Sequence, residues 1–160
     1  MKKVLGFDQS YTSSGFVVTL EDGSVVEFGT FKTDKTLDVY DRARQVAEFV
    51  VNKVTFHSIT HINIEGLAFG IRGDATRDLA GLLFVVLTSL RNARLDTKCT
   101  IVAPTSLKKF ATGSGKSDKA AMIAAVPEWF LTAIKDAGYK KTTGMADIVD
   151  AYWLSLFKLS

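Results

Sequence analysis

Four acidic residues stand where a carboxylate is unusual, at the ends of predicted strands or inside an apolar helix. Asp8 follows the apolar residues 4–7, and Glu65 follows the alternating residues 61–64. If these runs form neighbouring parallel strands, both acids emerge at the carboxyl edge of the sheet, where open α/β sheets bind their ligands. Each acid taken alone can also be explained as the start of a polar loop. Their pairing is therefore what points to a functional site.

Asp147 and Asp150 are the only charged residues in residues 146–157, a segment that is apolar on almost every side. A helix of this composition should be buried, and an ionised carboxylate inside it is unfavourable unless it is paired or binds a metal. Residues three apart share one face of a helix, so both side chains can reach a common point. For Asp147, an interaction with the helix dipole in the first turn is an alternative, which is weaker for Asp150.

Together the four carboxylates predict a site for hard divalent cations. Clustered carboxylates repel one another unless cations are present, and a ligand set of oxygen atoms favours Mg²⁺ or Mn²⁺ over zinc. Two such ions about 4 Å apart support an in-line displacement at phosphorus. We therefore expect a nuclease in which Asp8, Glu65, Asp147 and Asp150 hold two Mg²⁺ ions, for which Mn²⁺ can substitute.

The positive charge of the chain is concentrated in residues 105–119. The lysines of this stretch are Lys108, Lys109, Lys116 and Lys119. They stand against a single acid, Asp118, so the stretch accounts for the whole net charge of +3. A local basic patch suits a phosphate-bearing partner such as DNA, although a solvated lysine-rich loop explains the same charges.

Hydrophobic periodicity and turn signals predict the elements that position these residues. Strands are predicted at residues 4–7, 15–19, 25–30, 61–65 and 100–103. Helices are predicted at residues 37–51, 72–95, 117–129 and 144–156, the third capped by Ser117 with Asp118 in its first turn. This order predicts an α/β protein with a mixed five-stranded sheet, three antiparallel strands followed by parallel strands, flanked by helices in a single domain over residues 1–160.

Two further features bear on where the protein works. The apolar residues 79–90 fall short of the roughly 20 needed to span a bilayer and are typical of a buried helix. The apolar stretch after Met1 stops too early for a signal peptide, and the single Cys99 cannot form an intramolecular disulfide. We expect a cytoplasmic protein that has no membrane partner.

The chain resembles the RuvC family of Holliday junction resolvases, within the ribonuclease H-like superfamily. Four segments carry the resemblance, which extends over nearly the whole chain: GFDQSYTSSGF, INIEG, APTSLKKFATGSGKSDKAAM and DIVDA. The resemblance implies the ribonuclease H-like fold and assigns the four acids as catalytic metal ligands. It also implies that Lys108 and Lys119 contact DNA near the scissile phosphate, Lys119 nearest to it as a catalytic residue, with Lys109 and Lys116 neutralising other phosphates.

The activity implied by the resemblance is metal-dependent cleavage of branched DNA, above all of four-way junctions, leaving a 5′-phosphate and a 3′-hydroxyl. Resolving a junction needs two symmetric cuts, which implies a two-fold homodimer. The helix at residues 79–90 is the candidate interface, since one face can pack on the sheet while the other meets its copy. Ser10 and Thr12, in the polar turn after Asp8, would lie beside the scissile phosphate.

The chain departs from the family pattern at two places. An aromatic residue is expected three positions after Glu65, where it helps to hold the junction open, but Ala68 stands there. Phe69 is its neighbour, and we expect it to take this role in contacting DNA. The chain is also short at its C-terminus for a cellular resolvase, as expected of a phage or mobile-element version that would act in the host cytoplasm.

Two other functions fit parts of the sequence. The pattern of Asp8, Gln9, Ser13 and Ser14 is similar to the phosphate-binding turn of the sugar kinase and actin-like superfamily. Such kinases need two domains around a nucleotide cleft, whereas 160 residues hold one, so we expect no nucleotide cofactor. The second alternative is a junction-binding protein of the same fold with weak or no cleavage.

Overall fold

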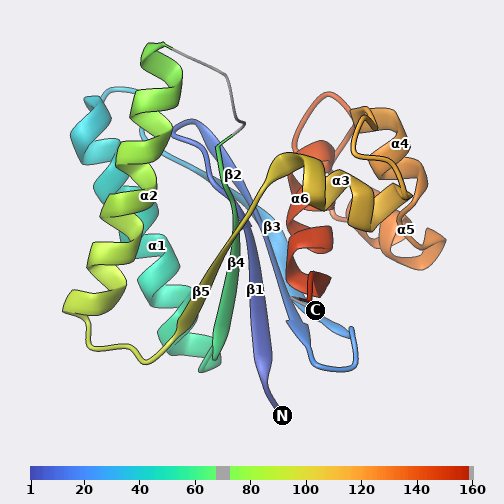
Figure 1. Ribbon diagram of the computed structural model, residues 1–160, viewed down its shortest axis with the longest axis horizontal. Coiled ribbons are helices and arrows are strands. Elements are labelled where there is room, and N and C mark those ends of the chain that lie inside the picture. The colour runs from blue at the N-terminus through green and yellow to red at the C-terminus, as the bar shows by residue number, and fades with distance from the viewer. Residues whose placement is uncertain (68–72, 159–160) are drawn as a thin grey trace.

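A mixed five-stranded sheet forms the centre of the computed structural model, which describes residues 1–67 and 73–158 (Figure 1). The strands are β1 (Lys3–Asp8), β2 (Ser13–Leu20), β3 (Val25–Lys32), β4 (His61–Glu65) and β5 (Lys98–Val102). Their order across the sheet is β3-β2-β1-β4-β5. The first three strands are antiparallel, and β4 and β5 run parallel to β1. The predicted sheet is thereby confirmed.

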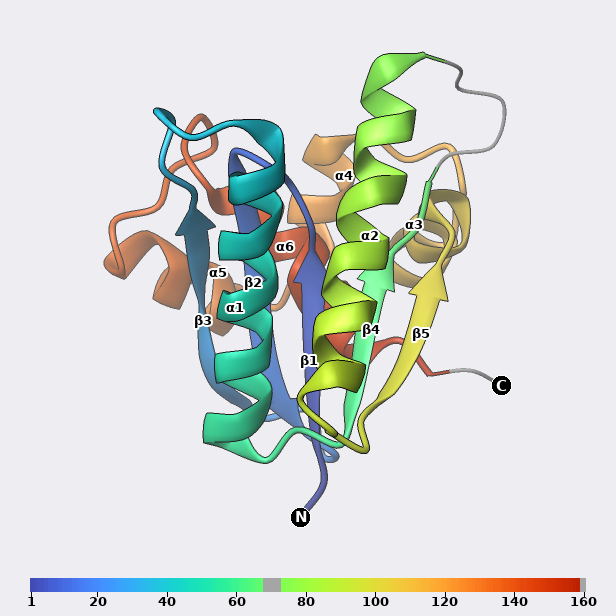
Figure 2. The ribbon, with the colours of Figure 1, turned by 90° about the vertical axis from the view of Figure 1, so that its left-hand side faces the viewer.

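Helices cover both faces of the sheet (Figure 2). On one face lie α1 (Val39–His57) and α2 (Asp74–Asn92). On the other lie α3 (Pro104–Thr112), α4 (Lys119–Ala124), α5 (Glu128–Asp136) and α6 (Met145–Leu156). Within the described residues, no helix has the length and apolar content needed to cross a membrane.

The alternation of β1 divides the buried residues between the two faces. Leu5 and Phe7 belong to the core under α1 and α2, whereas Gly6 and Asp8 face α6. The second core, between the sheet and the other helices, includes Phe130, Ile134, Ile148 and Leu154. As the sequence predicts, α6 is buried along most of its length.

A glycine allows α6 to approach the sheet closely. A Cβ at position 6 would lie 1.9 Å from the carbonyl oxygen of Ala151, so a larger residue could not occupy this position without displacing the helix. The helix therefore packs directly over β1. This contact determines how far the acidic residues of α6 lie from the end of that strand.

The predicted elements after β5 are partly wrong. Pro104 does not only end the strand but begins α3, because proline is well suited to the first turn of a helix. The predicted helix at 117–129 is divided into α4 and α5, since Pro127 cannot continue α4 and precedes the first residue of α5. Its N-cap is Asp118 and not Ser117, and the Asp118 carboxylate accepts a hydrogen bond from the backbone N–H of Ala121 at 2.8 Å.

The predicted burial of residues 79–90 holds for one side of α2 only. Leu82, Val86 and Leu90 are buried against the sheet. Phe84, on the opposite side, is 69% exposed. The helix spans residues 74–92 instead of 72–95, and Arg72 lies outside the described residues.

Candidate active site

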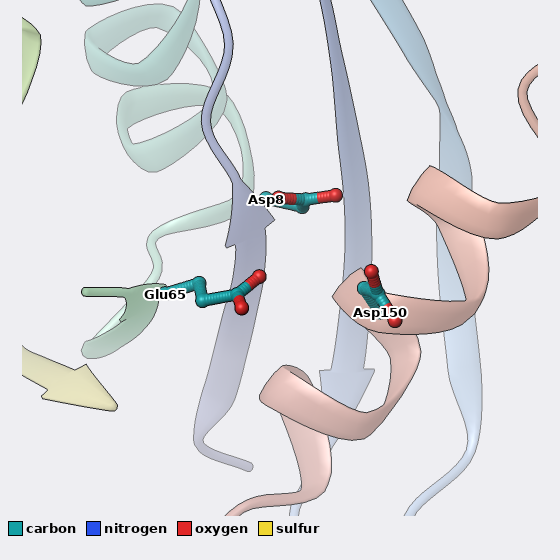
Figure 3. Close-up of side chains that lie close together, drawn as sticks. All are labelled: Asp8, Glu65 and Asp150. Atoms are coloured by element: carbon teal, nitrogen blue, oxygen red, sulfur yellow. The ribbon is translucent and has the colours of Figure 1, made fainter. Parts of the chain in front are cut away.

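Three of the four predicted acids converge in space. Asp8 ends β1, Glu65 ends β4, and Asp150 lies in the middle of α6. One carboxylate oxygen from each lies within 4.8 Å of the others. Asp8 and Glu65 extend from their strands toward the helix that carries Asp150 (Figure 3). Residues separated by more than 140 positions in the sequence thus form one acidic cluster.

The pairing of the strands explains why Asp8 and Glu65 meet. The strands β1 and β4 are parallel neighbours, with Phe7 opposite Ile64. The two acids are the next residues of their strands, so both emerge at the same edge of the sheet. The sequence predicted this arrangement, because each acid directly follows the apolar part of its strand.

Asp147 lies beside the cluster of Asp8, Glu65 and Asp150 and not inside it. It is one turn earlier on α6 than Asp150 and lines a separate pocket. Its charge still raises the pKa of both Asp8 and Asp150, so it is electrostatically part of the site. Burial raises the pKa of Asp147 itself, while Lys119 opposes this shift.

Burial and mutual repulsion raise the pKa values of the clustered carboxyls. Burial, followed by the charges of Asp150, Glu65 and Asp147, raises the pKa of Asp8 well above its ordinary value. The same causes, burial and then Glu65 and Asp147, raise the pKa of Asp150 to about 7. Burial also raises the pKa of Glu65, against the opposing effects of Lys108 and a hydrogen bond with Asp8. In the absence of a cation, both effects therefore oppose charging all three carboxyls together.

This electrostatic state fits the binding of hard divalent cations. The donors are carboxylate oxygens alone, which are the ligands that Mg²⁺, Mn²⁺ and Ca²⁺ prefer. A divalent charge among them would replace protons and lower the pKa values that burial raises. Asp8, Glu65 and Asp150 are therefore the residues that can hold such an ion.

Two of the predicted lysines lower the pKa values of the acids. Lys108, on α3, lowers the pKa values of Glu65 and Asp150. Lys119, the first residue of α4, lowers those of Asp8, Asp147 and Asp150. The remaining two predicted lysines, Lys109 and Lys116, are exposed on α3 and in the loop that follows it.

The polar turn after Asp8 uses the hydroxyl groups of Ser10 and Ser14 in its own hydrogen bonds. The Ser10 Oγ accepts hydrogen bonds from the backbone N–H groups of Thr12 at 3.1 Å and Ser13 at 3.4 Å. The Ser14 Oγ accepts from the backbone N–H of Ser10 at 3.0 Å. Thr12 is exposed beside this turn. The hydroxyl-rich sequence thus shapes the turn that reverses the chain from β1 into β2.

Two predictions near Glu65 lie outside the described residues. Ala68 and Phe69 belong to residues 68–72, so the proposed replacement of the family aromatic by Phe69 stays a prediction.

One feature beside the acidic cluster was not predicted from the sequence, a polar pocket lined in part by Asp147. It lies between the ends of β2 and β3 and the loop at residues 138–144. Its lining comes from three separate segments, so no contiguous sequence motif predicts it. A local signal exists in residues 140–143, two lysines and two threonines directly before α6.

Comparisons with known proteins place the fold but find no relative by sequence. No family model matches the chain, and no curated protein matches it. A structure of RuvC from Thermus thermophilus is similar, with a TM-score of 0.71 and 17% sequence identity over 96% of this chain and 91% of that one. The complex of T. thermophilus RuvC with a Holliday junction substrate gives a TM-score of 0.73 and 17% identity over 98% and 92%.

A third similar structure is the yeast mitochondrial Holliday junction resolvase Ydc2. Its TM-score is 0.67, with 13% identity over 97% of this chain and 76% of that one. The chain therefore has the fold of these proteins, and the predicted ribonuclease H-like architecture is confirmed.

Proposed function

We propose that this protein is a metal-dependent endonuclease that cleaves branched DNA, foremost four-way junctions, by paired symmetric nicks. The observation that carries the proposal is the convergence of Asp8, Glu65 and Asp150 at the carboxyl edge of β1 and β4. The similarity in fold to a RuvC structure that holds a Holliday junction supports this choice of substrate. The products would carry a 5′-phosphate and a 3′-hydroxyl.

The acids would hold two Mg²⁺ ions, with Mn²⁺ able to substitute. Asp8, Glu65 and Asp150 would supply the central ligands, and Asp147 would complete the set from the adjacent turn of α6. Bound cations supply Lewis-acid stabilisation of the charge that develops on phosphate oxygens during hydrolysis. The protein holds the ligands in place through β1, β4 and the close packing of α6.

The lysines would bind and orient the DNA. Lys119 would lie nearest the scissile phosphate, since its charge lowers the pKa values of three of the four acids. Lys108 would stabilise the same strand from the side of Glu65. Lys109 and Lys116, both exposed, would neutralise phosphates farther along the arm. Ser10 and Thr12 would border the strand at the turn after Asp8, and Phe69 would contact the opened junction.

Paired nicks on a symmetric junction require two active sites related by a two-fold axis. We propose a homodimer formed through the outer side of α2, where Phe84 is exposed. No nucleotide cofactor is required. The reducing cytoplasm suits the single free cysteine, Cys99.

The decisive experiment compares matched four-way, three-way, flap and linear DNA substrates. Each is incubated with the protein in Mg²⁺, in Mn²⁺ and with EDTA. Cleavage of the four-way junction in either metal, abolished by EDTA, is the expected result. Binding without cleavage in both metals would identify a junction-binding protein instead. Thermal stabilisation by ATP in the absence of DNA would favour the kinase alternative.

A further inference from the structure

A polar pocket of about 450 Å³ adjoins the acidic cluster on the side of β3. Its wall toward the cluster is Asp147, and its other polar lining groups include Ser13, Thr30, Thr143 and Lys32. The pocket therefore combines hydroxyl groups with an ammonium group, which can donate hydrogen bonds to an anion.

Strand pairing places this pocket on the same face and edge of the sheet as Asp8. Asp8 is opposite Gly15 across β1 and β2, and Gly15 is opposite Thr30 across β2 and β3. Ser13 is opposite Lys32 in the same register. Side chains two residues apart on a strand share a face, so the lining of the pocket continues the row that begins at the acidic cluster.

The loop that closes the pocket is held by its own hydrogen bonds. Lys140 and Thr143 bond each other through both backbone pairs, at 3.2 and 2.9 Å. The Tyr139 hydroxyl accepts from the backbone N–H of Thr30 at 3.3 Å and so joins the loop to β3. Gly144, with φ of 89°, packs against the Tyr139 ring, where a Cβ would approach to 2.8 Å. These contacts hold the loop in place beside β3.

The charges around the pocket suit a phosphate and not another cation. Lys32 lines it, and Lys140 and Lys141 belong to the loop that closes it, whereas Asp147 is the one carboxylate in its lining. The charge of Asp147 also acts on Asp8 in the acidic cluster, so cations bound by the cluster would offset it. With cations bound there, Lys32 would be the remaining charge in the lining, and a ligand in the pocket would meet a net positive charge.

The pocket lies on the opposite side of the cluster from the lysine that acts on Glu65. The order of the strands is β3-β2-β1-β4-β5. Lys108 lowers the pKa of Glu65, which ends β4, whereas the pocket is lined by residues of β2 and β3. The loop between α5 and α6 can be seen beside β3 in Figure 2. A strand crossing the cluster from Lys108 would therefore reach the pocket on the other side.

We propose that this pocket binds a backbone phosphate of the cleaved DNA strand, next to the scissile phosphate and on the side away from Lys108. The proposal rests on the nuclease function proposed above. Lys32 and the Thr143 hydroxyl are the donors to that phosphate, and the site fixes how far the strand extends beyond the metals. It is a positioning site, because its groups contact the substrate backbone and not the reacting atoms.

The test combines substitutions with neutralised phosphates. Single-turnover cleavage rates are measured on four-way junctions that carry one methylphosphonate at successive positions on both sides of the cut. The proteins are the wild type, Lys32→Met, Thr143→Val and the control Lys98→Met, an exposed lysine at the start of β5. Thermal denaturation checks that each variant is folded. Lys32 and Thr143 are both exposed, so the substitutions should be tolerated.

We expect Lys32→Met to slow cleavage of the unmodified junction roughly tenfold, since it removes a charge-assisted hydrogen bond to phosphate. One methylphosphonate position should slow the wild type and Lys98→Met by a similar factor but should slow Lys32→Met and Thr143→Val less, because each of these variants has already lost one of the two donors to that phosphate. If every position slows Lys32→Met as much as the wild type, the pocket does not bind a phosphate, although the nuclease function stands. If the wild type cleaves no substrate, the nuclease function and this inference both fail.

Discussion

The main chain of Asp147 lies against Gly15 so closely that a Cβ at position 15 would be 2.1 Å from the Asp147 carbonyl oxygen. Gly15 is also the strand partner of Asp8. This contact sets the distance between β2 and α6 and, because β2 pairs with β1, helps to set the position of Asp150 relative to Asp8. The geometry of the acidic cluster therefore depends on this backbone contact as well as on its own side chains.

Gly15→Ala should consequently destabilise the protein and disrupt the cluster. An added methyl group that meets backbone atoms cannot be accommodated by a side-chain rotation, so we expect a loss of about 3 kcal/mol or more in the free energy of unfolding. Urea denaturation measures this loss. Gly81→Ala is the matched control, because its nearest neighbour, the Tyr11 hydroxyl, is 3.7 Å away and alanine favours the helix. Equal stability of the two variants would contradict the close packing of α6.

Asp8→Asn should abolish cleavage while leaving junction binding nearly intact. Loss of a residue that only orients a metal ligand typically lowers activity 10- to 100-fold, so loss of a ligand should lower the cleavage rate by more than about 100-fold. Cleavage is measured on the four-way junction, and binding is measured by fluorescence anisotropy in the same buffer. A variant that still cuts at the native rate would show that Asp8 does not hold the metal.

Stability without metal should fall as the pH rises. The pKa of Asp150 in the folded protein is about 7, against an ordinary value of 3.8, so the folded state binds more protons between these values. Its stabilising effect is complete below about pH 4 and is lost as the pH rises through 7. Asp8, whose pKa is also raised, acts in the same direction.

Thermal denaturation at pH 5 and pH 8 in EDTA tests this pH dependence. Relative to the wild type, Asp150→Asn should be more stable at pH 8 by several degrees and should lose much of the pH dependence. Mg²⁺ should stabilise the wild type at pH 8 more than the variant, because the cation replaces the protons. Asp136→Asn, an exposed acid on α5, is the control. Parallel pH profiles of the wild type and Asp150→Asn would contradict the raised pKa.

The double substitution of Lys108 and Lys119 by alanine should weaken the salt dependence of DNA binding. Removal of two phosphate contacts should reduce the slope of log K against log salt concentration by roughly 2. Alanine at Lys2 and Lys98, two exposed lysines at the other end of the sheet, removes the same charge and should leave the slope nearly unchanged. An unchanged slope in the Lys108 and Lys119 variant would show that these two residues do not contact DNA phosphates.

Phe84→Asp should weaken self-association without unfolding the chain. Phe84 is 69% exposed on the outer side of α2, so a charge there should oppose packing against a second copy but not against the sheet. Sedimentation velocity over a range of concentrations measures the mass. Phe56→Asp is the control, on the neighbouring helix α1 and 81% exposed. If Phe84→Asp and the wild type have the same mass distribution, the dimer does not use this face.

The sequence by itself determined which acids end strands and in what order the strands follow. Asp8 and Glu65 each terminate an apolar run, and that local pattern is enough to place them at one edge once the strands are parallel. Asp150 was identified by its apolar surroundings in α6, since a carboxylate there requires a partner. These inferences need only the residues on either side of each acid in the sequence. Local propensity and hydrophobic periodicity are enough to interpret such short segments.

Local pattern was insufficient where proline set the boundaries. Pro104 and Pro127 can end one element or begin the next, and the choice depends on whether the following residues pack against α6. The packing of Leu107 and Phe130 in the core beside α6 decides it.

Only the tertiary structure decided how the acids divide and what lies beside them. The three-residue spacing of Asp147 and Asp150 on α6 predicts that their side chains converge. The close packing of α6 on β2 instead directs Asp147 to the neighbouring pocket. That pocket unites β2, β3 and a loop more than 100 residues later, so its chemistry depends on contacts between distant segments. A sequence specifies each residue's own chemistry, whereas a binding site also depends on distances that arise only when the sheet and helices pack.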